Sequence, residues 1–230
     1  MPSGGAIARE VWAENLESEF EVISGVVDDF PFVSMNTEFH GVIFKSDLRR
    51  GNPADLYSLL KSNVDALSLI QVGLTLSDSD RNLPDLGDGQ RISTWLVTHT
   101  PGFASRPARD RFWPNAKAPI SEVCGADDVA GLVCNEEVSW VTFHSAYDFG
   151  YLMKILTRRE LPCALGEFHR VMRALFGERV YNVKHMMRFC ERRLYGGLDR
   201  VARTLEVNRE VGKCHQAVRI VCSRRTHFRG

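Results

Sequence analysis

The chain has 230 residues, of which 44% are hydrophobic and 25% are charged, and its formal net charge at pH 7 is zero. This length and apolar content suffice for one globular domain with a full core. Zero net charge excludes a global field that recruits nucleic acid, so any such binding requires a local basic patch. No apolar run approaches the ~20 residues of a membrane span and no signal peptide begins the chain, so we expect a soluble intracellular protein without a membrane partner.

The cysteines form no C-x-x-C pair and no other spacing that is typical of zinc sites. This scatter predicts reduced thiols that pack in the interior of a cytosolic or nuclear protein. The cysteines are Cys124, Cys134, Cys163, Cys190, Cys214 and Cys222.

The first predicted element is an amphipathic helix over residues 7–27, because apolar side chains recur there at steps of three and four. It ends before the turn-forming sequence Asp28-Asp29-Phe30-Pro31. The next segments predict, in chain order, a strand over 32–39, a helix over 56–67, a buried strand over 69–76, a turn at 78–80 and a strand over 92–99.

Residues 101–119 hold four of the nine prolines and show no helical period. We expect a loop there. The later segments predict a strand over 138–144, helices over 147–157 and 168–176, a short strand over 179–183, and helices over 184–193 and 198–205. Strands that alternate with helices after an initial meander predict a mixed α/β sheet flanked by helices.

Three segments carry residues suited to chemistry at phosphate. Glu38 lies two residues after Asn36 on a predicted strand, so both side chains share one face. An acid-x-acid pair there would hold hard cations through oxygen ligands, but Asn36 is neutral. Taken alone, Thr37 and Glu38 are more simply ordinary residues at a strand end. Asp148 falls in the first turn of a predicted helix, where the helix dipole alone explains an acid. His215 would suit a base that activates water beside two divalent metals, although taken alone it is equally a surface histidine.

The aromatic residues around Asp148 predict core packing more than a base-stacking platform, and His144 predicts a structural role. The aromatic residues are Tyr147, Phe149 and Tyr151.

These segments together resemble the deadenylase subunit of the Ccr–Not complex, the CCR-associated factor (Caf/Pop) family of poly(A)-specific exoribonucleases, in its plant-like form. The resemblance runs through residues 7–39, 62–78, 138–162 and 180–217 in the order of the family. Its most specific part is the match of VTFHSAYDFGYL to the family motif VTFHS-x-YDFGYL.

The resemblance implies an RNase H-like fold and an exonuclease site named for four acids and a histidine. The D-T-E motif of the family falls on Asn36 and Glu38, the third acid on Asp148, and the general base on His215. The fourth acid falls on Ile220, five residues after that histidine. Glu38 and Asp148 would then be ligands of Mg²⁺ or Mn²⁺ in a two-metal site, with Asn36 as a degraded ligand position.

The implied function is 3′-to-5′ exoribonuclease action on the mRNA poly(A) tail, in mRNA decay and transcription regulation, in nucleus and cytoplasm. The implied partners are a Ccr-type nuclease subunit and the Not scaffold. Because metal assistance contributes several kcal/mol and each ~1.4 kcal/mol is tenfold in rate, losing two acids should lower activity by several orders of magnitude. The alternatives are a catalytically inactive scaffold subunit of the same complex and a chain that does not fold stably.

We expect one domain over residues 1–230 whose C-terminal part is truncated by a non-native tail over residues 218–230. Restoring one base in a possible coding sequence after Ala217 makes the following residues read Gly-Pro-Asp-Ser-Leu-Leu-Thr, close to the family continuation G-S-D-S-L-L-T. The tail contains four arginines and no acid. A basic nucleic-acid patch is the rival interpretation of this segment.

Overall fold

The computed structural model describes residues 6–45, 51–87, 89–98, 131–190 and 194–205. The predicted loop and the predicted non-native tail lie outside these residues, as do His215 and Ile220. Both segments, and the single domain over the whole chain, therefore remain predictions.

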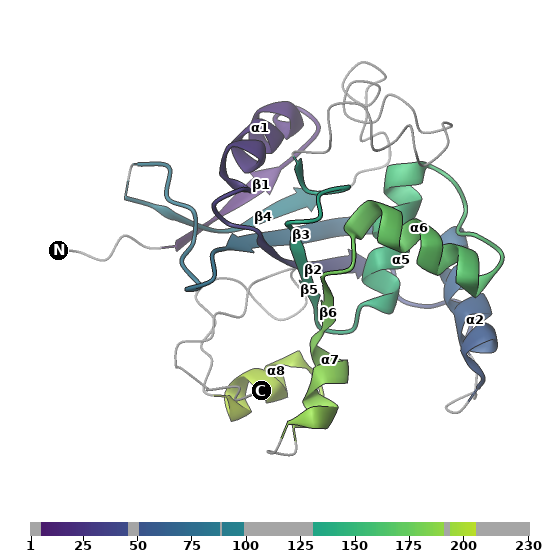
Figure 1. Ribbon diagram of the computed structural model, residues 1–230. Helices are drawn as coiled ribbons and strands as arrows, with labels where there is room; N and C mark the ends of the chain where they lie inside the picture. The colour runs from purple at the N-terminus through teal and green to yellow at the C-terminus, as the bar shows by residue number, and fades with distance from the viewer. Residues whose placement is uncertain (1–5, 46–50, 88, 99–130, 191–193, 206–230) are drawn as a thin grey trace.

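A six-stranded mixed sheet forms the centre of the fold, with the strand order β1-β4-β3-β2-β5-β6 (Figure 1). β2, β3 and β4 form the predicted antiparallel meander, and β5 adds to β2 in parallel. β1 pairs in parallel with β4, and β6 pairs in parallel with β5. The strands are β1 (Ala6–Val11), β2 (Phe32–Phe39), β3 (Leu69–Ser77), β4 (Arg91–Thr98), β5 (Ser139–Thr142) and β6 (Val180–Asn182).

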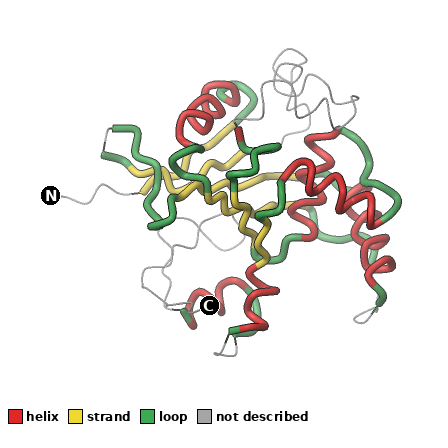
Figure 2. The backbone as a smooth tube through the Cα atoms, viewed as in Figure 1, coloured by secondary structure: helices red, strands yellow, loops and turns green. Residues whose placement is uncertain are grey.

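Helices flank the sheet, which confirms the predicted mixed α/β fold. Figure 2 shows the strands at the centre of the molecule with helices on more than one side. The helices are α1 (Leu16–Val26), α2 (Pro53–Ala66), α5 (Ala146–Thr157), α6 (Leu165–Phe176), α7 (Val183–Met186) and α8 (Leu198–Thr204), with a 3-10 turn η2 (Met187–Phe189). None of the helices in the described part of the chain has the length and apolar content needed to span a membrane.

The prediction of one helix over residues 7–27 is wrong in its first part. The chain forms β1 there, because pairing with β4 satisfies its backbone. The Asn15 side chain then accepts from the Trp12 N–H at 2.7 Å and donates to the Glu10 carbonyl at 3.0 Å, which builds a turn before α1. The apolar spacing continues through this turn, so the sequence pattern does not reveal it.

The predicted helix over residues 184–193 is also shorter than expected. Helical structure ends at Phe189, because Cys190 takes an extended backbone with φ −75° and ψ 135°. The other predicted elements in the described residues are confirmed within a few positions.

The core lies on one face of the sheet, under α1, α2, α5 and α6. Trp140 of β5 packs edge-on against Phe149 of α5 and Phe176 of α6, with ring centroids 6.3 and 5.3 Å away. Burial of Phe149 and Tyr151 confirms that these aromatic residues belong to the core.

The expectation of reduced thiols is wrong at Cys134, which is disulfide-bonded. The scatter of the cysteines in the sequence does not decide the redox state, because a disulfide requires both a geometry that brings two thiols together and an oxidising environment. Cys163 and Cys190 are free.

Candidate functional site at the end of strand β2

Asn36 and Glu38 lie on the same face of β2, as the strand period predicts. The Asn36 amide Nδ2 donates to Glu38 Oε1 at 3.4 Å. An aspartate at position 36 would place a second acceptor beside this oxygen, with no hydrogen to share. The uncharged amide of Asn36 therefore donates a hydrogen bond to Glu38 at the position where a second carboxylate would help to attract a cation.

Asp148 is joined to the same strand across 111 positions of sequence. Its Oδ1 accepts from the Thr37 backbone N–H at 3.0 Å and from the Thr37 hydroxyl at 2.7 Å. β5 ends at Thr142, opposite Met35, so the Thr37 N–H lies beyond the last pair of the β2–β5 ladder. The Asp148 carboxylate accepts this N–H in place of a carbonyl of a neighbouring strand. Asp148 is thus attached to the carboxyl end of β2 through Thr37, whose side chain lies on the opposite face of the strand from Asn36 and Glu38.

A tight connection from β5 to α5 aims Asp148 at the strand. Ser145 has φ 46°, a backbone conformation that costs a non-glycine residue about 1–3 kcal/mol. Its hydroxyl lies 2.5 Å from the Thr142 hydroxyl, which holds this turn. Asp148 follows in the first turn of α5, where the helix dipole favours a negative charge.

The segment after Glu38 is clamped by a buried asparagine. Asn63 of α2 is fully buried, and its Oδ1 accepts from the backbone N–H groups of Ile43 and Phe44 at 2.8 and 2.9 Å. Its Nδ2 donates to the carbonyls of Phe44 and Leu59 at 2.9 and 3.0 Å. The end of β2 is therefore held from both sides, by α5 and by α2.

Burial raises the pKa of Asp148 above its ordinary value, although the Thr37 hydrogen bonds and His144 act to lower it. Burial, then Lys184, lowers the pKa of His144, while Asp148 acts to raise it. Burial is thus the stronger influence on the Asp148 carboxyl, and it favours the protonated form.

A cavity of about 180 Å³ lies on the Asn36 face, between the sheet and α8. Asn36 lines it, whereas Glu38 and Asp148 do not, and most of its wall is apolar. Within the described part of the chain, the cavity is therefore a packing space under α8 without a carboxylate in its wall. Its wall includes Ser34, Gly73, Phe143, Val201 and Leu205.

The described residues near the end of β2 supply oxygen donors of the kind that hard cations bind. Two carboxylates and one amide oxygen are ligands that Mg²⁺ and Mn²⁺ accept. Within the described ranges, however, no three residues among His, Cys, Asp and Glu gather closely enough to hold a metal. The predicted base His215, and Ile220 in place of the fourth acid, lie outside these ranges. The roles of Glu38, Asp148 and His215 therefore remain predictions.

Two residues that matter at this site escape the sequence patterns. Thr37 points to the buried face of β2, so strand alternation marks it as core, yet it anchors Asp148. Asn182 occupies a position where the resembling family usually has aspartate, and its side chain caps α7 by accepting from the His185 N–H at 2.9 Å. The asparagine keeps this cap because its carbonyl oxygen serves as well as a carboxylate.

Comparison with known proteins identifies the class to which this α/β domain belongs. Residues 11–101 match the CAF1 family ribonuclease domain. The chain is 40% identical over 228 residues to the probable CCR4-associated factor 1 homolog 7 of Arabidopsis thaliana, covering 91% of this chain and 80% of that protein. It is 33% identical to the poly(A) ribonuclease pop2 of Schizosaccharomyces pombe, over 91% of this chain and 64% of that protein.

Two solved structures of related proteins also match the chain. The Mg²⁺- and Mn²⁺-bound form of S. pombe Pop2p matches with a TM-score of 0.71 at 31% identity, covering 92% of this chain and 86% of that one. Yeast CAF1 co-crystallized with the NOT1 MIF4G domain matches with a TM-score of 0.64 at 28% identity, over 88% and 79% of the two chains. The chain belongs to the CAF1 family of ribonucleases.

Proposed function

We propose that this chain is a 3′-to-5′ exoribonuclease of mRNA poly(A) tails in the Ccr–Not complex, with activity strongly reduced by Asn36. The observation that carries this proposal is the joining of Asp148 to Thr37, between Asn36 and Glu38. That contact keeps the acid positions of a nuclease at one strand end, while the amide at position 36 removes one of the charges.

Glu38 and Asp148 would hold a single Mg²⁺ or Mn²⁺, with the Asn36 carbonyl as a weak third ligand. A divalent cation supplies charge stabilisation at a scissile phosphate. The relative bound to Mg²⁺ and Mn²⁺ supports this choice of metal. In this chain Thr37 orients one oxygen of Asp148, and Asn36 orients one oxygen of Glu38.

The decisive experiment is a deadenylation assay on a 5′-labelled RNA with an oligo(A) 3′ end, in Mg²⁺ or Mn²⁺. We expect slow removal of adenosines by the unaltered chain and none by Glu38→Gln. Asn36→Asp should raise the rate by about tenfold or more, because a carboxylate replaces a neutral ligand. Ser34→Asp is the matched control: it adds the same charge on the same strand face, two residues earlier, and should leave the rate unchanged.

A double repair tests the whole assignment of the site. It combines Asn36→Asp with residues 218–224 replaced by Gly-Pro-Asp-Ser-Leu-Leu-Thr, which changes Ile220 to an acid. We expect this variant to be the most active. No activity in the double repair would overturn the assignment of the four acid positions.

A second candidate is a scaffold subunit that docks the Not scaffold and a Ccr-type nuclease without hydrolysing RNA. The neutral hydrogen bond between Asn36 and Glu38 favours it, and so does the relative co-crystallized with NOT1. Co-purification of the chain with a MIF4G-type Not domain, together with no turnover in the assay above, would select the scaffold. Turnover that disappears in Glu38→Gln would reject it. For either function we propose that the chain works in nucleus and cytoplasm, which a fluorescent fusion would test.

A further inference from the structure

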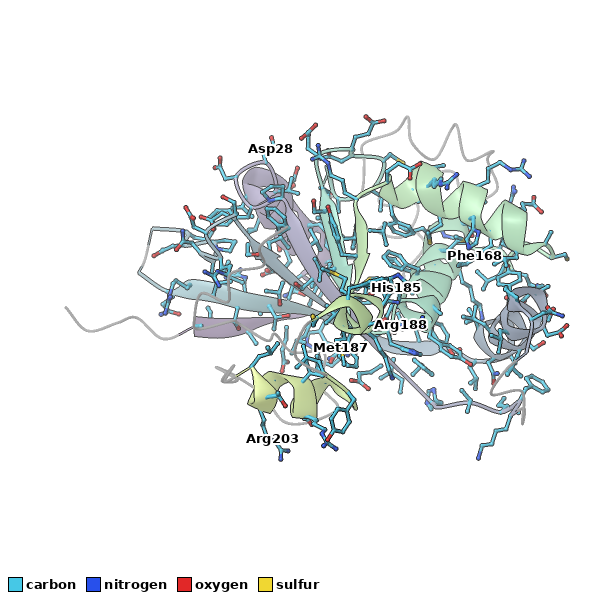
Figure 3. All side chains as sticks on the ribbon, turned by 60° about the horizontal axis from the view of Figure 1, so that its bottom comes forward. Asp28, Phe168, His185, Met187, Arg188 and Arg203 are labelled. Atoms are coloured by element: carbon cyan, nitrogen blue, oxygen red, sulfur yellow. The ribbon has the colours of Figure 1, made fainter. Side chains whose placement is uncertain are left out.

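A basic and aromatic surface surrounds α7, η2 and the beginning of α8, opposite the core face of the sheet (Figure 1). Figure 3 looks onto it: His185 and Arg188 lie together at the end of the α7 segment, while Arg203 projects away from them on the outer side of α8. We define the basic–aromatic surface by exposed residues other than Arg203. They are Lys184, His185, Arg188, Phe189, Tyr195 and Arg200.

Among the described residues, the positive charges of Lys184 and Arg188 are not neutralised by an ion pair. Residues 180–190 contain no acid, and Asp199, only partly exposed, is the single acid in 194–205. Neither Lys184 nor Arg188 forms an ion pair with any described residue. Exposed Arg173 and Arg179, by contrast, pair with Glu178 and Glu137 at 3.3 and 3.0 Å.

Exposed aromatic rings lie beside cationic side chains on this surface. Phe189 is 78% exposed, and its ring meets the His185 ring edge-on with centroids 5.3 Å apart. The Arg200 guanidinium lies 3.8 Å from the centroid of the Tyr195 ring, which is 60% exposed. Leaving large rings in water is unfavourable, so their exposure beside cations indicates a ligand with flat apolar faces and negative charge.

The surface adjoins the cavity that Asn36 lines. Lys184 Nζ lies 5.8 Å from the centroid of the Phe143 ring. Phe143 lines the same cavity as Asn36. Lys184 also lies close enough to His144 to add to the lowering of its pKa, of which burial is the larger cause.

We propose that the basic–aromatic surface binds single-stranded RNA that leads into the site, with bases stacked on Phe189 and His185 and phosphates bound by Lys184 and Arg188. Single-stranded nucleic acids are held by this combination of exposed rings and cations along a backbone. The proposal rests on the proposed function for the class of substrate. Because the net charge of the chain is zero, a local surface of this kind is required for RNA binding.

The test is fluorescence anisotropy of a labelled oligo(A) RNA with the full chain in EDTA, so that no hydrolysis occurs. Phe189→Ala should weaken binding about fivefold or more, the loss expected for one stacked base. Lys184→Glu with Arg188→Glu should weaken it more and reduce the slope of log affinity against log salt by about 1.4, for two phosphate contacts. These side chains are exposed, so the thermal midpoint of each variant should match that of the unaltered chain.

The matched control is Arg170→Glu with Arg173→Glu. It makes the same change of charge on exposed positions of α6, which packs on the core face of the sheet. It should retain the affinity of the unaltered chain. The arginines between residues 219 and 229 are present in every variant, so their contribution cancels in the comparison.

Equal weakening by the control pair, or unchanged affinity in the surface variants, would overturn the proposal. Competition by a poly-glutamate peptide as effective as competition by unlabelled oligo(A) would overturn it too, in favour of an acidic protein partner. Rapid poly(A) removal by the unaltered chain would contradict the impaired activity proposed above and leave this inference standing. The two proposals therefore fail separately.

Discussion

The two faces of the central sheet differ in how completely they are built. The face under α1, α2, α5 and α6 holds a continuous apolar core, and its buried polar groups are mostly paired. Glu19, for example, accepts two 2.6 Å hydrogen bonds from Arg9 and a third from Trp95 at 3.2 Å. The opposite face has α8 over a cavity and carries the neutral Asn36 where the family has an acid. The part that supports the fold is thus intact, whereas the part that would perform chemistry is weakened.

The largest expected effect tests the built face. Phe176→Ala removes a fully buried ring between Trp140 and Phe149 and should lower the free energy of unfolding by about 4 kcal/mol. Val201→Ala, on α8 beside the cavity, should cost about 1 kcal/mol, because fewer atoms are removed from a looser site. Urea denaturation with a common m-value measures both. Equal losses would contradict the difference between the faces.

A smaller effect concerns the half-buried lysine that joins α5 to α2. Lys154 Nζ donates to the carbonyls of Val64, Asp65 and Leu67 at 2.7, 3.0 and 3.0 Å, at the C-terminal end of α2. Burial, which outweighs the nearby acids, lowers its pKa. Lys154→Met should cost about 2 kcal/mol, because charge-assisted hydrogen bonds to helix carbonyls are lost. Thermal unfolding would show this; an unchanged midpoint would mean that the cap contributes nothing.

Tyr151 offers a change in the opposite direction. Its hydroxyl is buried without a hydrogen-bond partner in the described part of the chain, and burial raises its pKa to about 12. Tyr151→Phe should therefore stabilise the chain by about 1 kcal/mol. Tyr57→Phe is the matched control: it removes a 2.5 Å hydrogen bond to the Pro162 carbonyl and should destabilise. Stabilisation by both variants would contradict the assignment of the unpaired hydroxyl.

The smallest effect is the pH dependence that comes from Asp148. Its pKa in the folded chain is raised above 3.8, so the folded state keeps a proton that the unfolded state has released. The free energy of unfolding must therefore decrease as pH rises from about 3.8 through the pKa of Asp148 in the folded chain. Thermal midpoints measured across acidic pH should show this fall in the unaltered chain and lose it in Asp148→Asn.

Asp78→Asn provides a control of opposite sign. Burial acts to raise the pKa of Asp78, but hydrogen bonds from Asn82, together with those from the backbone of Asp80 and Arg81, lower the pKa overall. The stability that Asp78 contributes is present above its unfolded pKa and is lost as pH falls. A steeper fall of stability with rising pH in Asp148→Asn than in the unaltered chain would show that the sign for Asp148 is wrong.

Local periodicity predicted much of the fold. The apolar periods of the sequence predicted the meander, α2, α5 and α6. The structure confirms them, because each of these regular elements buries one of its sides. The helix expected over residues 7–27 failed, since an edge strand and an amphipathic helix share this apolar spacing and only β4 decides between them. The surface around α7 was also missed, because exposed residues follow no apolar period.

By itself, the amino-acid sequence determined that Asn36 and Glu38 share a strand face and that position 36 carries no charge. Both statements need only a period of two and the chemistry of an amide. The tertiary structure alone decided that Asp148 binds Thr37 and that Lys184 lies over Phe143. These contacts depend on where β5 and β6 end relative to β2, and strand register is a property of the packed sheet that no local pattern encodes.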